Sequence, residues 1–409
     1  EVVQALSDVI KLNTVNGNEK VVADYLADLL AKHGIDSKAV AYEPDRVSLV
    51  AEIGDGHGPV VGFDGHEDIV ALGDAAKWDA DALSAKIADG KMFGRGTTDM
   101  KSGLMAGVFA MIHLKENNVP LHGTLRLMAT VGEEYGQFGA RQLAEAGYAK
   151  NLDTLIVGEP SGVVKQAVAT PQIQQMLQIN QDSANKLMAA NQTTEQHFIE
   201  LAHKGSLTYT VTAQGVAAHS SMPEIGKNAI DSLLTFYQKQ QAYFATITDK
   251  KNPVLGATVP VVTLIQGGEQ INTVPASASI SVKIRTIPEV PNTKLATDIQ
   301  QLIDELNANG EQLSLDIHSN LYPVHTADDA PVVKAAKECG EADLQQALPL
   351  IGAPGGTDAA SFVAVNPDID VVVFGPGNIT AHQVNEYVDL DMYHRFITIY
   401  EKMITRMLA

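Results

Sequence analysis

Apolar residues near the start of the chain recur at the spacing of an amphipathic helix. Between Asn18 and Gly34, the side chains of Val22, Leu26 and Leu30 fall on one helical face. Asn18 is suited to cap the first turn, and Gly34 is suited to end the helix. The pattern therefore predicts that a helix beginning after Asn18 opens the fold.

Short, mostly apolar runs follow, and they are typical of strands buried on both faces of a sheet. The expected strands are residues 47–53, 60–63, 125–131, 155–157 and 371–374. Helical patterns at residues 101–116 and 137–146 lie between them. Strands that alternate with helices indicate a layered α/β/α domain with a mixed sheet.

The middle of the chain has a different pattern, in which apolar and polar residues alternate strictly. Strands are expected at residues 206–214, 259–266 and 276–286, and helices at residues 228–242 and 293–309. This β-α-β-β-α order predicts a small α+β domain with an antiparallel sheet.

These patterns divide the chain into two expected domains. The α/β domain comprises residues 1–204 and 320–409, and the α+β domain is inserted as residues 205–319. Residues 170–197 are rich in Gln and Asn with scattered apolar residues, and we expect an extra insertion there, helical in part.

Composition narrows the classes of function. The 409 residues carry a net charge of −20, which disfavours binding to phosphate backbones and so excludes nucleic acid as a partner. Cys339 is the single cysteine, so no internal disulfide can form. No apolar run approaches the roughly 18 residues of a membrane span. Because Glu1 is not an initiator methionine, we expect that a few residues precede it. The first segment lacks the pattern of a signal peptide, so we expect a cytoplasmic protein.

Acidic residues and histidines follow the carboxyl ends of the expected buried strands, where open α/β sheets bind their ligands. One strand leads into His66 and Asp68, the next into Glu133 and Glu134, another into Glu159, and the last leads through GPGN to His382, while Asp99 precedes the helix at residues 101–116. Carboxylates gathered in one pocket repel each other, and divalent cations remove that repulsion. Imidazoles with carboxylates suit zinc, and the spare carboxylates suit a two-metal hydrolase.

Each of these residues also has a structural explanation. The pair Glu133 and Glu134 could belong to a solvated surface, Asp99 could be a helix N-cap, and Glu159 could simply end a strand. The recurrence of such groups at four strand ends favours the metal site.

Several segments together resemble one family. In chain order they are GHEDIV, GRGTTDMKSG, VGEEYGQFG, VGEPSG, AHSSMPEIGKNAI and the NEY that follows His382. They resemble the di-zinc aminoacylase and carboxypeptidase family, which includes succinyl-diaminopimelate desuccinylase, acetylornithine deacetylase, bacterial tripeptidase and glutamate carboxypeptidase. The resemblance covers nearly the whole chain. It implies a catalytic α/β domain and an inserted domain that acts as a lid and in dimerisation.

The resemblance also implies a ligand set. His66 and Glu159 would hold one ion, Glu134 and His382 the other, and Asp99 would bridge both. Two divalent ions are thus expected, zinc first, with cobalt or manganese as alternatives.

Around these ligands the resemblance implies two further roles. Asp68 would orient His66, as metal-bound imidazoles require, and Glu133 would be the general base. A cis peptide bond would follow Asp99.

Candidate substrate-binding residues lie elsewhere. The resemblance implies that His219 reaches the active site of the partner subunit in a homodimer. Asn272 and Arg285 belong to the same inserted domain, and an Arg pairs bidentately with a substrate carboxylate. Gly356 and Thr357 lie in a glycine-rich turn whose backbone NH groups could cradle such a carboxylate.

The resulting hypothesis is a metal-dependent amidohydrolase acting on a small acidic N-acyl amino acid, with hydrolysis of N-succinyl-L,L-diaminopimelate to succinate and diaminopimelate as the first choice. Exopeptidase activity is the enzymatic alternative, and a non-catalytic binding protein on this fold is the other. The insertion at residues 170–197 departs from the family pattern and leaves the substrate open.

Overall fold

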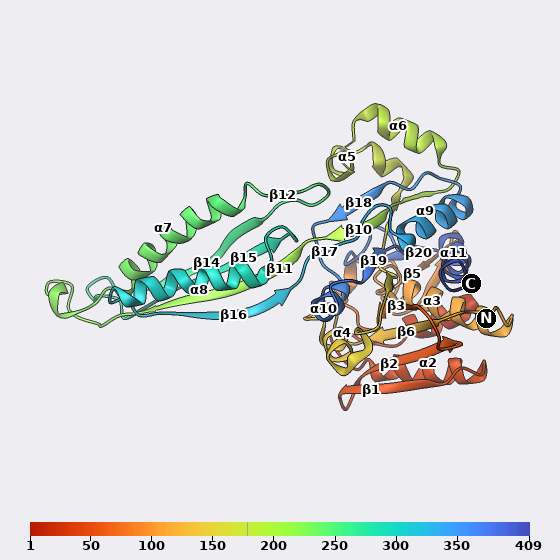
Figure 1. Ribbon diagram of the computed structural model, residues 1–409, viewed down its shortest axis with the longest axis horizontal. Coiled ribbons are helices and arrows are strands. Elements are labelled where there is room, and N and C mark those ends of the chain that lie inside the picture. The colour runs from red at the N-terminus through yellow and green to blue at the C-terminus, as the bar shows by residue number, and fades with distance from the viewer. Residues whose placement is uncertain (178) are drawn as a thin grey trace. The chain divides into compact units, whose positions relative to one another are not determined.

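The computed structural model describes residues 1–177 and 179–409, which form two compact units (Figure 1). The first comprises Glu1–Ala202, His325–Ile351 and Thr357–Ala409, and the second comprises His203–Val324 and Gly352–Gly356. Gly356, expected in the first domain, therefore groups with the second unit.

The first unit is built on a mixed sheet, as the sequence predicted. Its centre has the order β6 (Thr124–Thr130), β3 (Val60–His66), β7 (Thr154–Val157) and β19 (Asp370–Val373), and these four strands are parallel. β2 (Arg46–Gly54) and β1 (Ser37–Glu43) extend one side, and β10 (Ile199–His203), β17 (Val324–His325) and β18 (Leu350–Ala353) extend the other. Every residue of β3 and β7 is buried, which confirms the expectation of strands covered on both faces.

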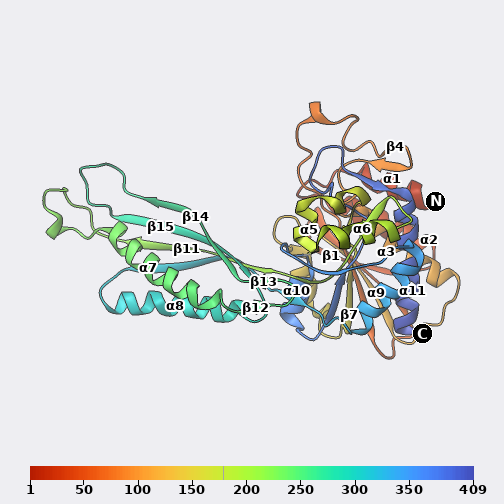
Figure 2. The same cartoon turned by 90° about the horizontal axis from the view of Figure 1, so that it is seen from above.

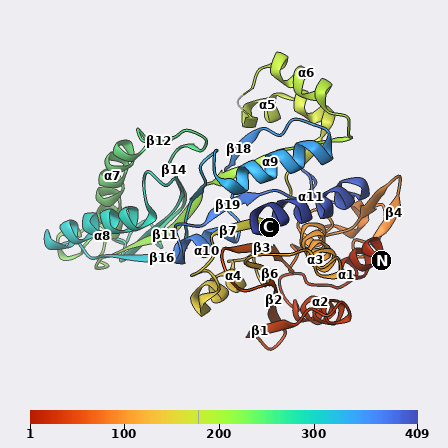
Figure 3. The ribbon, with the colours of Figure 1, turned by 45° about the vertical axis from the view of Figure 1, so that its right-hand side comes forward.

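Helices cover both faces of this sheet. α11 (Leu390–Leu408) runs beside α3 (Lys101–Glu116) and α9 (Pro331–Leu344) on one face (Figure 3). α4 (Phe138–Leu143) and α10 (Ala359–Val365) pack together on the other (Figure 1). The layered α/β/α prediction is confirmed.

The prediction for the start of the fold was wrong. α1 (Val2–Ile10) comes first, and its N-cap residue Glu1 makes no side-chain capping bond that would mark it in the sequence. α2 (Lys20–Lys32) begins one residue later than expected. The Asn18 side chain donates to the backbone oxygen of Asn13 and so does not cap the helix.

The extra insertion shares a small apolar core with the residues that flank it. It contains α5 (Pro171–Leu177) and α6 (Gln181–Ala190), so it is helical in part as expected; residue 178 lies outside the described residues. Antiparallel strands β8 (Gly162–Val164) and β9 (Glu195–His197) close its base. The buried side chains of this core are Val163, Val168, Ile173, Ala184, Phe198 and Ile351.

A smaller sheet lies next to the start of α3. It consists of β4 (Lys86–Ala88), β5 (Lys91–Phe93) and β20 (Tyr387–Asp389). β5 and β20 pair in antiparallel fashion, which joins the segment before Asp99 to the segment after His382.

The second unit is an antiparallel α+β layer, as its alternation predicted. Its sheet has the order β14 (Val259–Gly267), β15 (Ser277–Thr286), β11 (Gly205–Gln214) and β16 (Leu313–Leu321). α7 (Ala229–Ile247) and α8 (Asn292–Ala308) cover one face of it (Figure 2). The hairpin β12 (Lys251–Asn252) and β13 (Gly256–Ala257) follows α7.

No helix among the described residues is long and apolar enough to cross a membrane.

Candidate metal centre

Four parallel strands deliver the predicted residues to one edge of the sheet. His66 is the last residue of β3, Glu134 follows β6, Glu159 follows β7, and His382 lies in the loop after β19. Asp99 stands two residues before α3 and is followed by a cis peptide bond to Met100, as the resemblance implied. α3 can approach the backbone of Gly158 closely because Gly103 has no side chain. A Cβ at Gly103 would lie 1.8 Å from the carbonyl oxygen of Gly158.

Two ligand groups share Asp99. Around the first, His66 Nε2 lies 3.0 Å from Asp99 Oδ1 and 3.3 Å from Glu159 Oε1. Around the second, His382 Nε2 lies 3.1 Å from Asp99 Oδ2 and 3.1 Å from Glu134 Oε1. In each group the three ligand atoms lie within 4.8 Å of one another, which is close enough to hold one metal ion. The two oxygens of Asp99 thus face different histidines.

The charges of the cluster suit cations. The carboxylates of Asp99 and Glu134 raise the pKa of His382 to about 10, because they stabilise positive charge at its ring. Burial raises the pKa of Glu159 to about 8, and the neighbouring charge of Asp99 adds to this increase. Carboxylates that favour positive charge at a neighbouring ring provide the field that divalent cations require.

Asp68 is held as a support for the cluster. Its two oxygens accept hydrogen bonds from the backbone NH groups of Glu133 and Glu134, both at 3.1 Å. His66 Nδ1 lies 3.0 Å from the backbone oxygen of Asp68 and 3.5 Å from its Oδ1. Burial alone would raise the pKa of Asp68, but the hydrogen bonds from His66 and these NH groups lower it overall. An ionised Asp68 therefore orients both His66 and the start of the Glu133 loop.

Glu133 is half-buried and lies among other carboxyl groups. Burial raises its pKa well above the usual value, and the charges of Glu159, Asp358 and Glu134 add to the increase, although His66 opposes it. A carboxylate with a raised pKa beside a cation site can accept and return a proton.

Sequence reasoning quoted Glu386 in the NEY segment but gave it no role. The carboxylate of Glu386 is buried, and Oε1 accepts from the backbone NH groups of Gly96, Thr98 and Asp99 at 2.8–3.1 Å. Oε2 accepts from Arg95 Nη1 at 2.7 Å. Glu386 therefore fixes the loop that carries Asp99, and its place four residues after His382 was the available signal.

The predicted residues of the second unit lie at two ends of its sheet. His219 forms a β-bridge with Thr273, and its Nδ1 lies 2.7 Å from Ser221 Oγ. The backbone oxygen of Asn272 accepts from Ser220 N. Arg285 pairs in register with Ser206 and Val259 at the other end.

Lys204 is a basic neighbour of Arg285 that sequence reasoning missed. Burial lowers the pKa of Lys204, and the positive charge of Arg285 lowers it further. Gly356 lies in the second unit, close to the ring of His203, whereas Thr357 lies in the first. The backbone oxygen of Thr357 accepts from Gln137 Nε2 at 2.7 Å.

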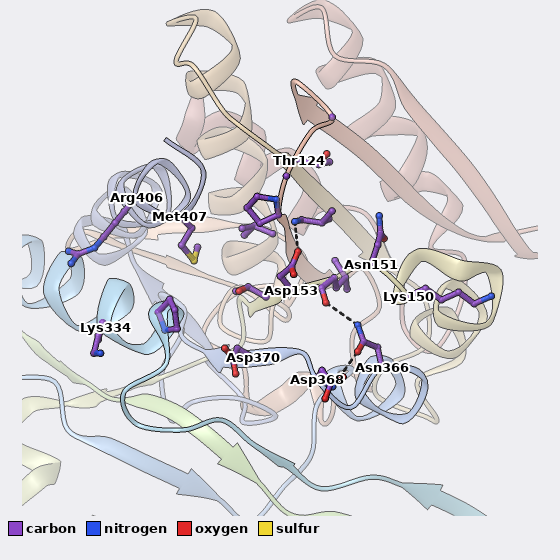
Figure 4. Close-up of a pocket in the computed structure, with 18 residues that line it drawn as sticks. Thr124, Lys150, Asn151, Asp153, Lys334, Asn366, Asp368, Asp370, Arg406 and Met407 are labelled. Carbon is purple, nitrogen blue, oxygen red and sulfur yellow. Dashed lines mark hydrogen bonds between the residues drawn. The ribbon is translucent and has the colours of Figure 1, made fainter.

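A cavity of about 1040 Å³ lies at the opposite edge of the first unit's sheet (Figure 4). Val60, Thr124, Thr154 and Asp370, the first residues of the four parallel strands, line it. The metal cluster lies at the other ends of these strands, so this cavity is separate from it.

Comparisons with known proteins identify the family of this chain. Residues 62–406 match the model of peptidase family M20/M25/M40. The chain is 37% identical to a probable succinyl-diaminopimelate desuccinylase of Staphylococcus aureus, over 98% of this chain and 96% of that protein. It is 23% identical to succinyl-diaminopimelate desuccinylase of Ehrlichia canis, over 97% of this chain and 96% of that protein.

Solved structures share the fold at lower identity. An M20 family metallo-carboxypeptidase of Sulfolobus solfataricus has a TM-score of 0.73 at 19% identity, over 99% of this chain and 98% of that chain. A dinuclear metal-binding M20 peptidase of Bacillus subtilis has a TM-score of 0.68 at 15% identity, over 100% and 97%. The chain therefore belongs to peptidase family M20/M25/M40 and is, as its sequence predicted, a metallo-hydrolase that acts on amide bonds.

Proposed function

We propose that this hydrolase removes the acyl group from an N-acylated amino acid, with N-succinyl-L,L-diaminopimelate as its substrate and succinate and diaminopimelate as its products. The observation that carries the reaction type is the pair of ligand groups joined by Asp99, with Glu133 beside them. The 37% identity to a probable succinyl-diaminopimelate desuccinylase along nearly the whole chain supports the substrate.

We assign the two cation sites residue by residue. His66 and Glu159 would hold one ion and Glu134 and His382 the other, and Asp99, whose two oxygens face the two histidines, would belong to both sites. Histidine and carboxylate ligands suit zinc, and cobalt and manganese can fit the same set.

The side chains around the cations divide the work of hydrolysis. Two such cations, when bound, supply a water of lowered pKa and polarise the amide carbonyl. Glu133 accepts the proton of the attacking water and then gives it to the leaving amine nitrogen. Asp68 holds His66 and the backbone of Glu133 in place, which keeps the base at a fixed position.

The second unit supplies recognition of the acidic substrate. Arg285 can pair bidentately with a carboxylate, and the neighbouring Lys204 adds positive charge. Asn272 lies beside His219 at the other end of the sheet, so its amide can donate a hydrogen bond to a substrate in the neighbouring subunit. The turn at Gly356 of the second unit and Thr357 of the first can offer backbone NH groups. These contacts suit a small substrate that carries several carboxylates.

We further propose that the enzyme is a homodimer in which His219 serves the neighbouring subunit. His219 lies beyond one end of the sheet and Arg285 lies near the other end, because Ser206 pairs with Arg285 and Gln214 pairs with Ser277. At about 3.3 Å per residue, the strand from Ser277 to Arg285 alone spans about 26 Å. One small substrate cannot contact both residues of the same chain.

The sheet of the second unit offers a surface for this dimer. β14 is an edge strand, and several of its apolar side chains are exposed. An exposed apolar edge pairs readily with a twofold copy of itself. The exposed apolar residues of β14 are Val259, Val261, Leu264 and Ile265.

With a single cysteine and no expected disulfide, we place the enzyme in the cytoplasm.

A substrate panel on metal-reconstituted enzyme tests the proposal. Release of diaminopimelate from its N-succinyl derivative should exceed hydrolysis of N-acetylated amino acids and of di- and tripeptides. Preferential hydrolysis of peptides would instead establish an exopeptidase. Metal binding without turnover of any amide would indicate a binding protein on this fold.

A further inference from the structure

The end of the extra insertion carries a row of buried polar side chains next to the metal centre. Glu195 and His197 belong to β9, and both are almost fully buried. His197 Nε2 lies 3.5 Å from Glu195 Oε2, which is an ion-pair distance without a hydrogen bond, and His197 Nδ1 lies 3.0 Å from Ser161 Oγ. Nothing in the proposed reaction uses these groups, yet burying a carboxylate and an imidazole is costly unless they are paired.

One end of this row of side chains reaches the loop that holds Glu159. Ser161 is two residues after Glu159, and its hydroxyl donates to the carbonyl of Gly375 at 2.8 Å. The backbone NH groups of Ser161 and Gly162 both donate to the carbonyl of Gly377, at 3.2 and 2.9 Å. The Glu159 loop is thereby tied to the loop that follows β19.

The other end reaches the loop that leads to His382. Glu195 Oε1 accepts from Asn378 Nδ2 at 3.0 Å. The backbone NH of Asn378 in turn donates to Thr98 Oγ1 at 3.3 Å, one residue before Asp99. Gly377 lies so close that a Cβ there would be 2.3 Å from the carbonyl oxygen of Thr98.

The side chain of Gln346 holds the backbone of β9 in place. Gln346 Oε1 accepts from the backbone NH of His197 at 2.6 Å, and Gln346 Nε2 donates to the backbone oxygen of Glu195 at 3.0 Å. The two side chains therefore project from a held strand toward both ligand loops, and neither loop can shift without breaking a buried hydrogen bond.

We infer that Glu195 and His197 are positioning residues that clamp the Glu159 loop to the His382 loop and so set the spacing between the two cation sites. The inference rests on the proposed metal centre. It gives the base of the insertion a role in the reaction, separate from any role of α5 and α6. Polar partners outside the ligand shell influence metal affinity when they fix ligand orientation.

The test compares metal affinity of the full-length enzyme with the stability of its metal-free form. Glu195→Ala should weaken binding of the more weakly held zinc ion about tenfold or more, measured by competition with a chromophoric chelator. Glu195→Gln should regain most of that affinity, because its amide can still accept from Asn378 and meet His197. Turnover at saturating zinc should show a lower kcat with little change in KM, since no substrate contact is lost.

Gln196→Ala is the matched control. Gln196 is buried in the same strand and donates to the backbone oxygens of His197 and Ala347, so its loss costs comparable hydrogen bonds without touching a ligand loop. If Glu195→Ala binds zinc as tightly as Gln196→Ala at a similar metal-free melting temperature, the pair is only structural and the inference is overturned.

A second variant covers the case in which Glu195→Ala does not fold. Ser161→Ala leaves β9 intact and removes the contact between His197 and the Glu159 loop, so it should weaken zinc binding in the same way. Unchanged affinity would overturn the inference. A wild-type enzyme that bound no divalent ion would refute the proposed metal centre itself, which is a different result from equal binding by wild type and variants.

Discussion

The cluster around Asp99 and the candidate residues of the second unit are built in opposite ways. His66 is buried, and hydrogen bonds from neighbouring backbone hold the carboxylate of Asp68 beside His66 and that of Glu386 beside the Asp99 loop. His219 and Asn272 are exposed, and the side chain of His219 meets Ser221, only two residues away. A cluster fixed from several elements is preorganised, whereas an exposed residue on a loop is free to meet a partner outside its own unit.

We expect the activity to depend on these two regions in different ways. Chemistry at the cluster should depend on charge and on the supporting hydrogen bonds, all of which the first unit contains. Contributions from the second unit should depend on the substrate's carboxylates and on a second subunit. Variants in the two regions should therefore differ in which kinetic constant they change.

Metal removal should have the largest effect and should be confined to the cluster. A chelator should abolish turnover, and zinc, cobalt and manganese should restore it to different extents, because a carboxylate-rich ligand set is not strongly selective. The metal-free protein should retain its circular dichroism spectrum, since Asp68 and Glu386 hold the loops through protein hydrogen bonds. Full activity in protein shown by elemental analysis to lack metal would rule out the proposed reaction.

Glu133→Gln should lower kcat by about a hundredfold or more while the protein keeps both metal ions. An amide cannot accept the proton of water, and Glu133 is not among the assigned ligands. Rates would be measured with saturating substrate, and metal content by elemental analysis. A variant with near wild-type kcat would show that another group is the base.

Mixing of subunits tests whether His219 works across a dimer. Glu133→Gln and His219→Ala subunits should each be almost inactive, and a reshuffled mixture should recover roughly a quarter of wild-type activity, because half of the dimers are mixed and each has one complete site. Subunit exchange must be verified independently with a mass or fluorescent label. Exchange without recovered activity would place His219 in its own chain's site or outside the reaction.

Arg285→Ala should have a smaller effect, expressed mainly in KM. Loss of a bidentate pair with a substrate carboxylate should cost about 1.5–3 kcal/mol, so KM should rise roughly ten- to hundredfold for carboxylate substrates. Amides that lack this carboxylate provide the control and should be affected much less. Equal changes for both classes would make Arg285 a structural residue.

Local sequence pattern predicted most elements of both sheets, and it failed where the pattern was weak. β1 was missed because most of its residues are exposed and its short apolar run, Ala39–Tyr42, contains two alanines, which are weak strand formers. α1 was missed because no capping residue marks its start. The helix at residues 101–116 was predicted with the bounds that α3 has, because its apolar residues are almost continuous.

Sequence by itself determined the family, the α/β and α+β character of the two regions and the residue types able to hold cations, because strand ends and motif order are local properties of the chain. Tertiary structure alone decided which oxygen of Asp99 faces which histidine, and that Glu386, Glu195 and His197 support the ligand loops. These supporting contacts join residues that are far apart in the chain, as Asp99 and Glu386 are. Their energy comes from burial and from paired hydrogen bonds, which exist only after the sheet has brought its strand ends together.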